Sequence, residues 1–324
     1  MTIRESIPGH NPKAVLDLIA QRRAGGPADP CRRLGLVVEG GGMRGVYTSG
    51  SLLALHLAGC GDVFDDLFGT SAGAVNGAHF LSGVGRHKAA TYYRWLSGRR
   101  FINVWRYPKV IDIDYFVDDV LSRLERVDVE GVARSKTDLW VAVLNQETAE
   151  VEVLNPRRAG LPLLPVLKAS VAIPVLYGRS VRIGGTDYID AGFAQPFPLR
   201  EAIAEGCTDI LVVTARPADY LTPPRRWWQR AIFNRCCARG NARLRAVYSS
   251  SAESQNVQRR LANGSLATPG VNIATLAPVD VRVKSTTTAA DLLRSETIQM
   301  CRRVLDIFGT EHAGLQALIE EGII

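Results

Sequence analysis

A serine lies at the centre of Gly69-Thr70-Ser71-Ala72-Gly73, a segment with the pattern Gly-x-Ser-x-Gly. In this pattern the serine occupies a sharp turn between a strand and a helix, which holds its hydroxyl above the sheet. The flanking residues must be small because the strand and the helix nearly collide there, and glycine also tolerates strained backbone angles. The segment therefore predicts that Ser71 is a nucleophile aimed at a substrate.

A second motif, Glu39-Gly40-Gly41-Gly42-Met43-Arg44-Gly45, precedes the serine by about one strand and one helix. A glycine-rich loop of this kind can direct free backbone N–H groups at the oxyanion that forms when a serine attacks a carbonyl carbon. Either motif alone is a weak signal. Together, and in this order, they indicate acyl transfer.

A serine hydroxyl needs a nearby base that takes its proton. Histidine is the usual base, and among the five histidines only His312 comes late enough for the chain order of α/β-hydrolases. Its surroundings, Gly309-Thr310-Glu311-His312-Ala313, are typical of the start of a helix. The better candidate is Asp190 in Tyr188-Ile189-Asp190-Ala191-Gly192, because an acid at a strand end followed by small residues can approach another backbone closely.

The elements around these motifs alternate between strands and helices. A buried strand over residues 34–38 leads into the glycine loop, and a helix over 46–58 follows it. A strand over 66–68 leads into Ser71, and a helix over 72–81 follows. This order favours a parallel sheet with helices on both faces. Further strands are expected at 139–144, 149–154, 181–183, 188–189, 210–214 and 272–276, and further helices at 112–124, 161–169, 199–205, 288–308 and 312–319.

Four segments, in the expected order, resemble the motifs of the patatin-like phospholipase family, and in particular its bacterial branch. They are Gly40-Gly41-Gly42-Met43-Arg44-Gly45, Gly69-Thr70-Ser71-Ala72-Gly73, Lys168-Ala169-Ser170-Val171-Ala172-Ile173-Pro174 and Asp190-Ala191-Gly192. The resemblance covers about residues 34–215. Glu39 and Ala191 depart from it, since the family commonly has aspartate and glycine there. The resemblance implies a three-layer α/β/α fold with a mostly parallel central sheet flanked by helices.

The resemblance also implies a function, a serine lipid acyl hydrolase that cleaves carboxylic esters of phospholipids, lysophospholipids or related acyl lipids. Such enzymes use a Ser–Asp dyad without histidine. Asp190 would accept the proton of Ser71 during attack on the ester, and would act as base again when water hydrolyses the acyl-serine. A free aspartate, with a pKa near 3.9, is a weak base. We therefore expect Asp190 to be largely buried, because burial raises its pKa.

In the same family pattern, the glycine loop forms the oxyanion hole. The backbone N–H groups of Gly41, Gly42 and Met43 are expected to hold the oxyanion, and Arg44 to stabilise the loop or to meet a negative charge of the substrate. This mechanism needs no cofactor and no metal, and the acids of the chain show no metal-ligand spacing.

Two alternatives to a hydrolase stay open. Gly40-x-Gly42-x-x-Gly45 also fits a dinucleotide-binding fingerprint. The acid expected to bind ribose about 20 residues further on would be Asp62, Asp65 or Asp66. A nucleotide site, however, does not require the elbow around Ser71. The other alternative is a catalytically weak, membrane-associated regulator with the same fold, against which the intact serine, aspartate and glycine loop argue.

A basic and aromatic segment, residues 222–262, follows the motifs. Seven arginines and no acid lie between residues 225 and 245. Arginine beside tryptophan is typical of a contact with an anionic membrane surface; a solvated helix face is the plain alternative. No nucleic-acid-binding motif accompanies the charge, so no nucleic acid partner is expected. The residues expected at the membrane are Arg225, Arg226, Trp227, Trp228 and Arg230.

The whole chain has 324 residues, is 46% hydrophobic and carries a formal net charge of +7. We expect a lead-in over residues 1–30, a catalytic domain over 31–280 and a helical C-terminal extension over 281–324 packed on the same domain. Residues 1–30 lack the apolar core of a signal peptide, and the six cysteines form no CxxC pair. These features predict a cytoplasmic protein with peripheral membrane contact.

Overall fold

A mixed, mostly parallel sheet forms the centre of the computed structural model, which describes residues 8–27, 29–83, 89–107 and 109–324. Hydrogen bonds link the strands along the path β5-β6-β3-β2-β1-β7-β8, and β4 pairs with β3 outside this path. Strands β2 and β6 pair with successive parts of β3 on the same side, opposite β4. The mutually parallel strands are β1 (Leu34–Val38), β2 (Asp66–Thr70), β3 (Asp138–Asn145), β7 (Asp209–Val213) and β8 (Asn272–Leu276). The antiparallel strands are β4 (Val151–Leu154), β5 (Val181–Ile183) and β6 (Thr186–Asp190).

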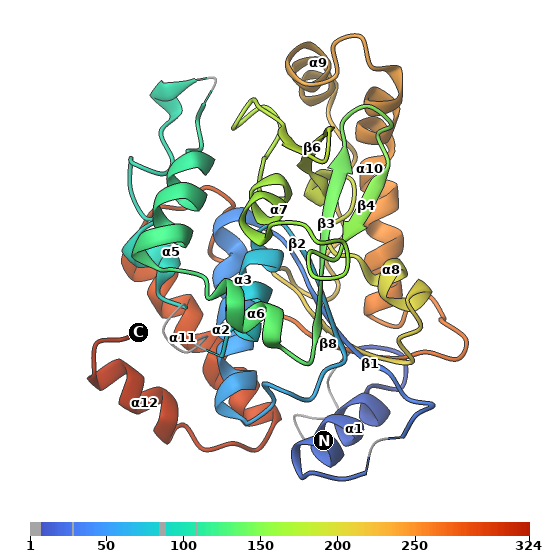
Figure 1. The fold of residues 1–324 in the computed structure, drawn as a ribbon, viewed down its shortest axis with the longest axis vertical. Coiled ribbons are helices and arrows are strands. Elements are labelled where there is room, and N and C mark those ends of the chain that lie inside the picture. The colour runs from blue at the N-terminus through green and yellow to red at the C-terminus, as the bar shows by residue number, and fades with distance from the viewer. Residues whose placement is uncertain (1–7, 28, 84–88, 108) are drawn as a thin grey trace.

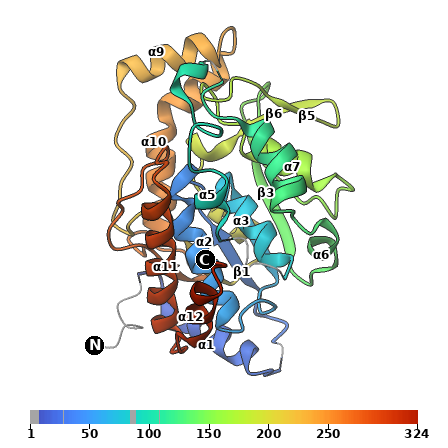
Figure 2. The same ribbon diagram turned by 90° about the vertical axis from the view of Figure 1, so that its left-hand side faces the viewer.

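Helices cover both faces of this sheet (Figure 1). On one face lie α2 (Gly45–Leu57), α3 (Ala72–Leu81) and α11 (Ala290–Ile307), and α11 packs along α2 (Figure 2). On the other face lie α8 (Leu199–Ala204) and α10 (Ala242–Ala262). The remaining helices are α1 (Pro12–Arg23), η2 (Gly42–Arg44), α5 (Thr91–Arg94), η3 (Val104–Arg106), η4 (Tyr115–Leu124), α6 (Val129–Arg134), α7 (Leu163–Ser170), η5 (Ala191–Phe193), α9 (Trp227–Cys236) and α12 (Ala313–Glu320).

The central strands are buried on both sides, which explains their continuous apolar sequences. Leu36 and Leu211 belong to the core under α2 and α11, whereas Val37 and Val212 belong to the core under α8 and α10. Successive side chains of a strand point to opposite faces, so each short apolar run contributes to both cores. The sheet is thereby held from both sides and provides a rigid base for the loops at its ends.

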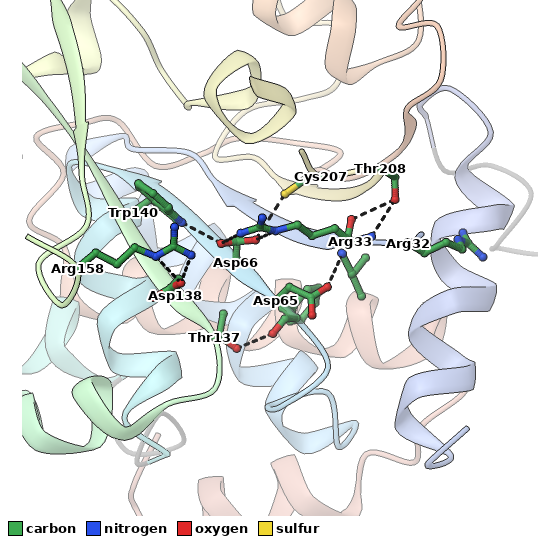
Figure 3. Close-up of polar contacts among 12 residues, drawn as sticks. Arg32, Arg33, Asp65, Asp66, Thr137, Asp138, Trp140, Arg158, Cys207 and Thr208 are labelled. Carbon is green, nitrogen blue, oxygen red and sulfur yellow. Dashed lines mark hydrogen bonds and ion pairs between the residues drawn. The ribbon is translucent and has the colours of Figure 1, made fainter. Parts of the chain in front are cut away.

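The parallel strands begin at one edge of the sheet, here called the amino edge. Several of them start with an acidic residue that accepts hydrogen bonds from an arginine. Figure 3 shows this polar cluster. Arg33 Nε and Nη2 donate to Asp66 at 2.5 and 2.9 Å, and Trp140 Nε1 donates to the same carboxylate at 2.9 Å. Asp138 accepts from Arg158 Nε at 2.9 Å. These bonds satisfy the charges where the strands begin.

The predicted fold class is confirmed, since a mostly parallel sheet lies between two layers of helices. The strands occupy the expected places, with boundaries that shift by a few residues. The helix expected over 112–124 contains η4, a π-type helix. The basic segment forms two helices, α9 and α10. Residues 1–7 of the expected lead-in lie outside the described part of the chain. Within the described residues, no helix combines the length and the apolar character that crossing a membrane requires.

Candidate active site

Ser71 lies on a strained turn between β2 and α3. Its backbone has φ 54° and ψ −128°, a conformation that non-glycine residues rarely adopt. A Cβ on Gly69 would lie 2.5 Å from the Cα of Ala74, and a Cβ on Gly73 would lie 2.4 Å from the carbonyl oxygen of Val38. Both glycines are therefore required by close contacts, as the Gly-x-Ser-x-Gly pattern predicts.

The sheet register brings Asp190 to this serine. Strand β4 occupies one edge of β3, so β2 and β6 share the other edge and meet end to end. Thr70, the last residue of β2, pairs with Ala142, and Asp190, the last residue of β6, pairs with the next residue, Val143. As a result, Ser71 Oγ donates a hydrogen bond of 2.7 Å to Asp190 Oδ2.

The Asp190 carboxylate is buried, with 5% of the residue exposed, as the sequence predicts. Its burial raises the pKa to about 6, although hydrogen bonds from the Gly192 N–H and from Ser71 Oγ oppose this rise. The Gly192 N–H donates to Oδ1 at 2.6 Å. A Cβ on Gly192 would lie 2.9 Å from Oδ1, so this position favours glycine. Ala191, which replaces a glycine of the family pattern, does not adopt a positive φ and carries no backbone strain of that kind.

Ser170 contributes to the site, and the sequence analysis assigned it no role. Its Oγ accepts a 2.8 Å hydrogen bond from the N–H of Ser71 and donates one of 2.9 Å to the carbonyl of Ala142. Two residues further on, the carbonyl of Ala172 accepts from the N–H of Asp190 at 3.1 Å. The segment Lys168–Pro174 thus holds the backbones of both Ser71 and Asp190. Its presence among the four motifs was the only signal of this role.

The glycine loop lies directly beside the serine. A Cβ on Gly40 would lie 2.8 Å from the Cβ of Ser71, and Gly42 has φ +59°. Gly41 and Gly42 line the cavity that contains Ser71, and within the described part of the chain their N–H groups have no hydrogen-bond acceptor. The N–H of Met43 donates instead to the carbonyl of Ser285, and the N–H of Arg44 to that of Gly41. Gly41 and Gly42 are therefore the free donors of this loop.

Two cavities meet at Ser71. The larger, of about 480 Å³, also contains Asp190 and is lined by arginine side chains. The smaller, of about 30 Å³, is lined mainly by apolar side chains, namely those of Met43, Leu96, Phe101, Ile113, Phe116, Val171 and Ile173. A hydroxyl between an apolar slot and a cationic chamber suits an ester that has an apolar acyl part and an anionic part.

The other candidate residues lie apart from this site. His312 Nε2 pairs with Asp306 at 2.9 Å, and none of the described residues that line the larger cavity is a histidine. Asp65 and Asp66 lie at the amino edge, where Asp65 accepts from Arg22 and from the N–H of Leu34. The glycine loop follows β1 at the opposite edge, so these acids are not placed to bind the ribose of a nucleotide held by that loop.

Three comparisons relate this chain to known proteins. A sequence model of the family described as "Patatin-like phospholipase" matches residues 36–203. The curated protein "Uncharacterized protein YjjU" of Escherichia coli (strain K12) is 30% identical over 205 residues, which are 61% of this chain and 56% of that protein. This chain thus spans little more than half the length of that relative. The crystal structure of VipD from Legionella pneumophila is similar with a TM-score of 0.39 and 14% identity, over 87% of this chain and 67% of that chain.

Proposed function

Because this chain belongs to the patatin-like phospholipase family, we propose that it is a lipid acyl hydrolase that cleaves carboxylic esters through Ser71 and Asp190. The observation that carries the proposal is the 2.7 Å hydrogen bond from Ser71 Oγ to the buried Asp190 carboxylate. A base with a pKa of about 6 is ionised near neutral pH yet accepts a proton more readily than an exposed aspartate.

The reaction follows from this geometry. Ser71 Oγ attacks the ester carbonyl while Asp190 takes its proton, and the N–H groups of Gly41 and Gly42 stabilise the oxyanion. Asp190 then gives the proton to the leaving alcohol. A water molecule, with Asp190 again as base, releases the fatty acid from the acyl-serine. The apolar slot beside Ser71 receives the start of the acyl chain, and the chain has to widen it by displacing side chains.

We further propose that α9 brings this site to an anionic membrane. Figures 1 and 2 place α9 at one end of the molecule, and Arg225, Arg226 and Gln229 are among the residues that line the larger cavity. Trp227 is 81% exposed. The segment around η3 joins this surface, because Tyr107 Oη lies 3.5 Å from Cys236 Sγ and Trp105 is 89% exposed. Exposed tryptophan next to arginine suits the interface of a bilayer with anionic headgroups.

The catalytic proposal is tested with p-nitrophenyl acyl esters of increasing chain length and with a fluorophosphonate label. We expect Ser71→Ala and Asp190→Asn to lower kcat/KM by about 10³-fold or more, and Ser71→Ala to abolish labelling. Ser265→Ala and Asp219→Asn, which change exposed side chains of the same types, serve as matched controls. Full activity of Asp190→Asn would refute the dyad. An inactive wild type that takes no label would favour the regulator with the same fold.

The membrane proposal is tested by sedimentation with vesicles. We expect the wild type to bind vesicles that contain phosphatidylglycerol and not pure phosphatidylcholine vesicles, and the double variant Trp227→Ala, Trp228→Ala to bind several-fold more weakly. Equal binding of this variant and the wild type would refute the assignment of α9.

A further inference from the structure

The larger cavity is strongly cationic. Its lining contains five arginines, Arg44, Arg216, Arg225, Arg226 and Arg259, and the only acids among its described lining residues are Glu39 and Asp190. The Asp190 carboxylate accepts hydrogen bonds from Ser71 and Gly192. The cavity therefore has a positive charge that its own acids do not balance.

Some of these arginines have structural partners. Arg259 Nη2 pairs with Glu39 Oε1 at 2.5 Å, and both residues are buried. The other carboxylate oxygen of Glu39 accepts from the N–H of Ala215 at 2.7 Å. Arg225 Nε donates to Ser251 Oγ at 2.9 Å. Both carboxylate oxygens of Glu39 thus already accept hydrogen bonds, and its single negative charge cannot neutralise a second arginine fully.

Arg44 and Arg216 differ from Arg259 because they have no carboxylate partner among the described residues; the Arg216 guanidinium lies instead over the Tyr220 ring, 4.0 Å from its centroid. Within the described part of the chain neither forms an ion pair, and Arg44 Nε is buried without a hydrogen-bond partner. Burial and the neighbouring charge of Arg216 lower the pKa of Arg44 to about 10. Burial also lowers the pKa of Arg216. Two cations are therefore held close together in a partly desolvated chamber, an arrangement that an incoming anion stabilises.

Their position relates them to the reaction. Arg44 Nε lies 3.6 Å from the place of a Cβ on Gly41, and the Cβ of Ala215, the residue before Arg216, lies 3.3 Å from the same place. Arg44 thus lies against the loop whose N–H groups would face the oxyanion, and Arg216 follows a residue that also packs against it. Both arginines line the same cavity as Ser71. Guanidinium groups suit phosphate oxygens because they offer several N–H donors in one plane.

We propose that this cationic chamber selects acyl phospholipids whose headgroup phosphate has no cationic partner, with Arg44 and Arg216 as the phosphate ligands. This inference rests on the proposed function, because it places the phosphate of the same substrate whose ester Ser71 attacks. A zwitterionic headgroup would bring a cationic amine into a chamber lined by five arginines, at an electrostatic cost. An anionic headgroup would instead neutralise the unpaired cations.

The test compares oleoyl lysophosphatidic acid with oleoyl lysophosphatidylcholine, each at low mole fraction in neutral detergent micelles so that the surface charge stays the same. For the wild type we expect a higher kcat/KM on the anionic lipid. Arg216→Gln should lower the ratio of kcat/KM on the anionic lipid to kcat/KM on the zwitterionic lipid about 10-fold or more. The reason is that a hydrogen bond between charged groups contributes more to the free energy of binding than one between neutral groups. Arg260→Gln, which removes an exposed arginine one residue from Arg259, is the matched control and should keep the ratio.

Failures of the two proposals are distinguishable. If the wild type hydrolyses p-nitrophenyl esters but treats both lysolipids alike, or if Arg216→Gln keeps the wild-type ratio, the headgroup inference is wrong and the hydrolase proposal stands. If no ester is hydrolysed, both are wrong. Calorimetric titration of Ser71→Ala with inorganic phosphate and with glycerol 3-phosphate identifies the source of the anion. Tight binding of inorganic phosphate, together with equal turnover of both lysolipids, would assign the chamber to free phosphate and overturn the headgroup assignment.

Discussion

The two edges of the central sheet use arginine in opposite ways. At the amino edge, where the parallel strands begin, Arg32 pairs with Asp209. Figure 3 shows that Arg33 pairs there with Asp66 and Arg158 with Asp138. At the carboxyl edge, where β1 and β2 lead into the glycine loop and Ser71, Arg44 and Arg216 have no acidic partner within the described residues. One edge satisfies its charges inside the protein, and the other leaves them unsatisfied.

This difference separates stability from function. A charge that the protein pairs internally contributes to folding, and its removal leaves the partner buried and unpaired. A charge that stays unpaired in a cavity costs free energy of folding and is retained for a ligand. The strained backbone of Ser71 and the raised pKa of Asp190 lie at the same carboxyl edge. Strain, burial and unpaired charge thus gather where we propose the chemistry.

The largest effect on stability is expected at the amino edge. Asp66→Ala removes the acceptor of Arg33 and of Trp140 Nε1, and the Asp66 side chain is fully buried. We expect the free energy of unfolding to fall by about 4 kcal/mol, measured by urea denaturation. Since Asp66 does not line the larger cavity that contains Ser71, kcat/KM on a neutral ester should stay within about twofold for the folded protein.

The matched control is Asp62→Ala, which removes an exposed carboxylate just before the same strand. It should change the stability by less than about 0.5 kcal/mol. A loss of activity in Asp66→Ala without a loss of stability would contradict the division between the two edges. It would also revive a ligand-binding role for that acid.

The second prediction concerns pH, to which the two edges should respond with opposite sign. Burial raises the pKa of Asp190 to about 6, so the folded state binds more protons than the unfolded state between about pH 4 and 6. The stability contribution of Asp190 therefore falls as pH rises through this window, by about 3 kcal/mol. Burial alone would also raise the pKa of Asp209, but hydrogen bonds from Arg32, Asn272 and Thr208 hold it below its usual value. Its contribution is present above about pH 4 and is lost as pH falls.

Urea denaturation of the wild type and of Asp190→Asn over this pH range isolates the contribution of Asp190 to the free energy of unfolding. The stability of Asp190→Asn relative to the wild type should increase as pH rises from about 4 to about 7. Over the same range kcat/KM of the wild type should rise with a midpoint near pH 6 and approach a plateau at about pH 7, because only the carboxylate would accept the Ser71 proton. A flat stability difference would show that Asp190 titrates as an ordinary exposed aspartate.

Sequence reasoning located the parts of this site that depend on local geometry. Gly69, Gly73 and the glycine loop are recognisable because close backbone contacts there exclude other residues. Apolar runs predicted the strands, because a strand that is buried on both faces needs apolar residues at successive positions. The meeting of β2 and β6 beside β3, which brings Asp190 to Ser71, is a matter of long-range register that periodicity does not contain. Asp190 was selected as an acid at a strand end followed by small residues, and the family resemblance supported it, whereas Ser170, 99 residues from Ser71, stayed unassigned.

The sequence also could not predict which arginines form ion pairs with acids and which do not. In the sequence, Arg33 and Arg216 have similar surroundings, because each lies beside an apolar segment that predicts a strand. What distinguishes them is the presence of Asp66 next to one and of a cavity next to the other, and both depend on the packing of segments far apart in the chain. Net charge therefore indicated an anionic partner without showing which arginines would meet it.

The smallest expected effect is the most direct test of the comparison, because it makes one chemical change at both edges. Arg33→Gln removes a paired charge and should lower the free energy of unfolding by about 2–3 kcal/mol, less than a fully buried pair because Arg33 is 35% exposed. Arg44→Gln removes an unpaired charge beside Arg216, so stability should stay within about 0.5 kcal/mol or rise slightly. The measurement is urea denaturation of both variants at neutral pH and moderate salt. If Arg44→Gln were as destabilising as Arg33→Gln, Arg44 would be a structural residue of the glycine loop, and the contrast between a satisfied and an unsatisfied edge would rest on Arg216 alone.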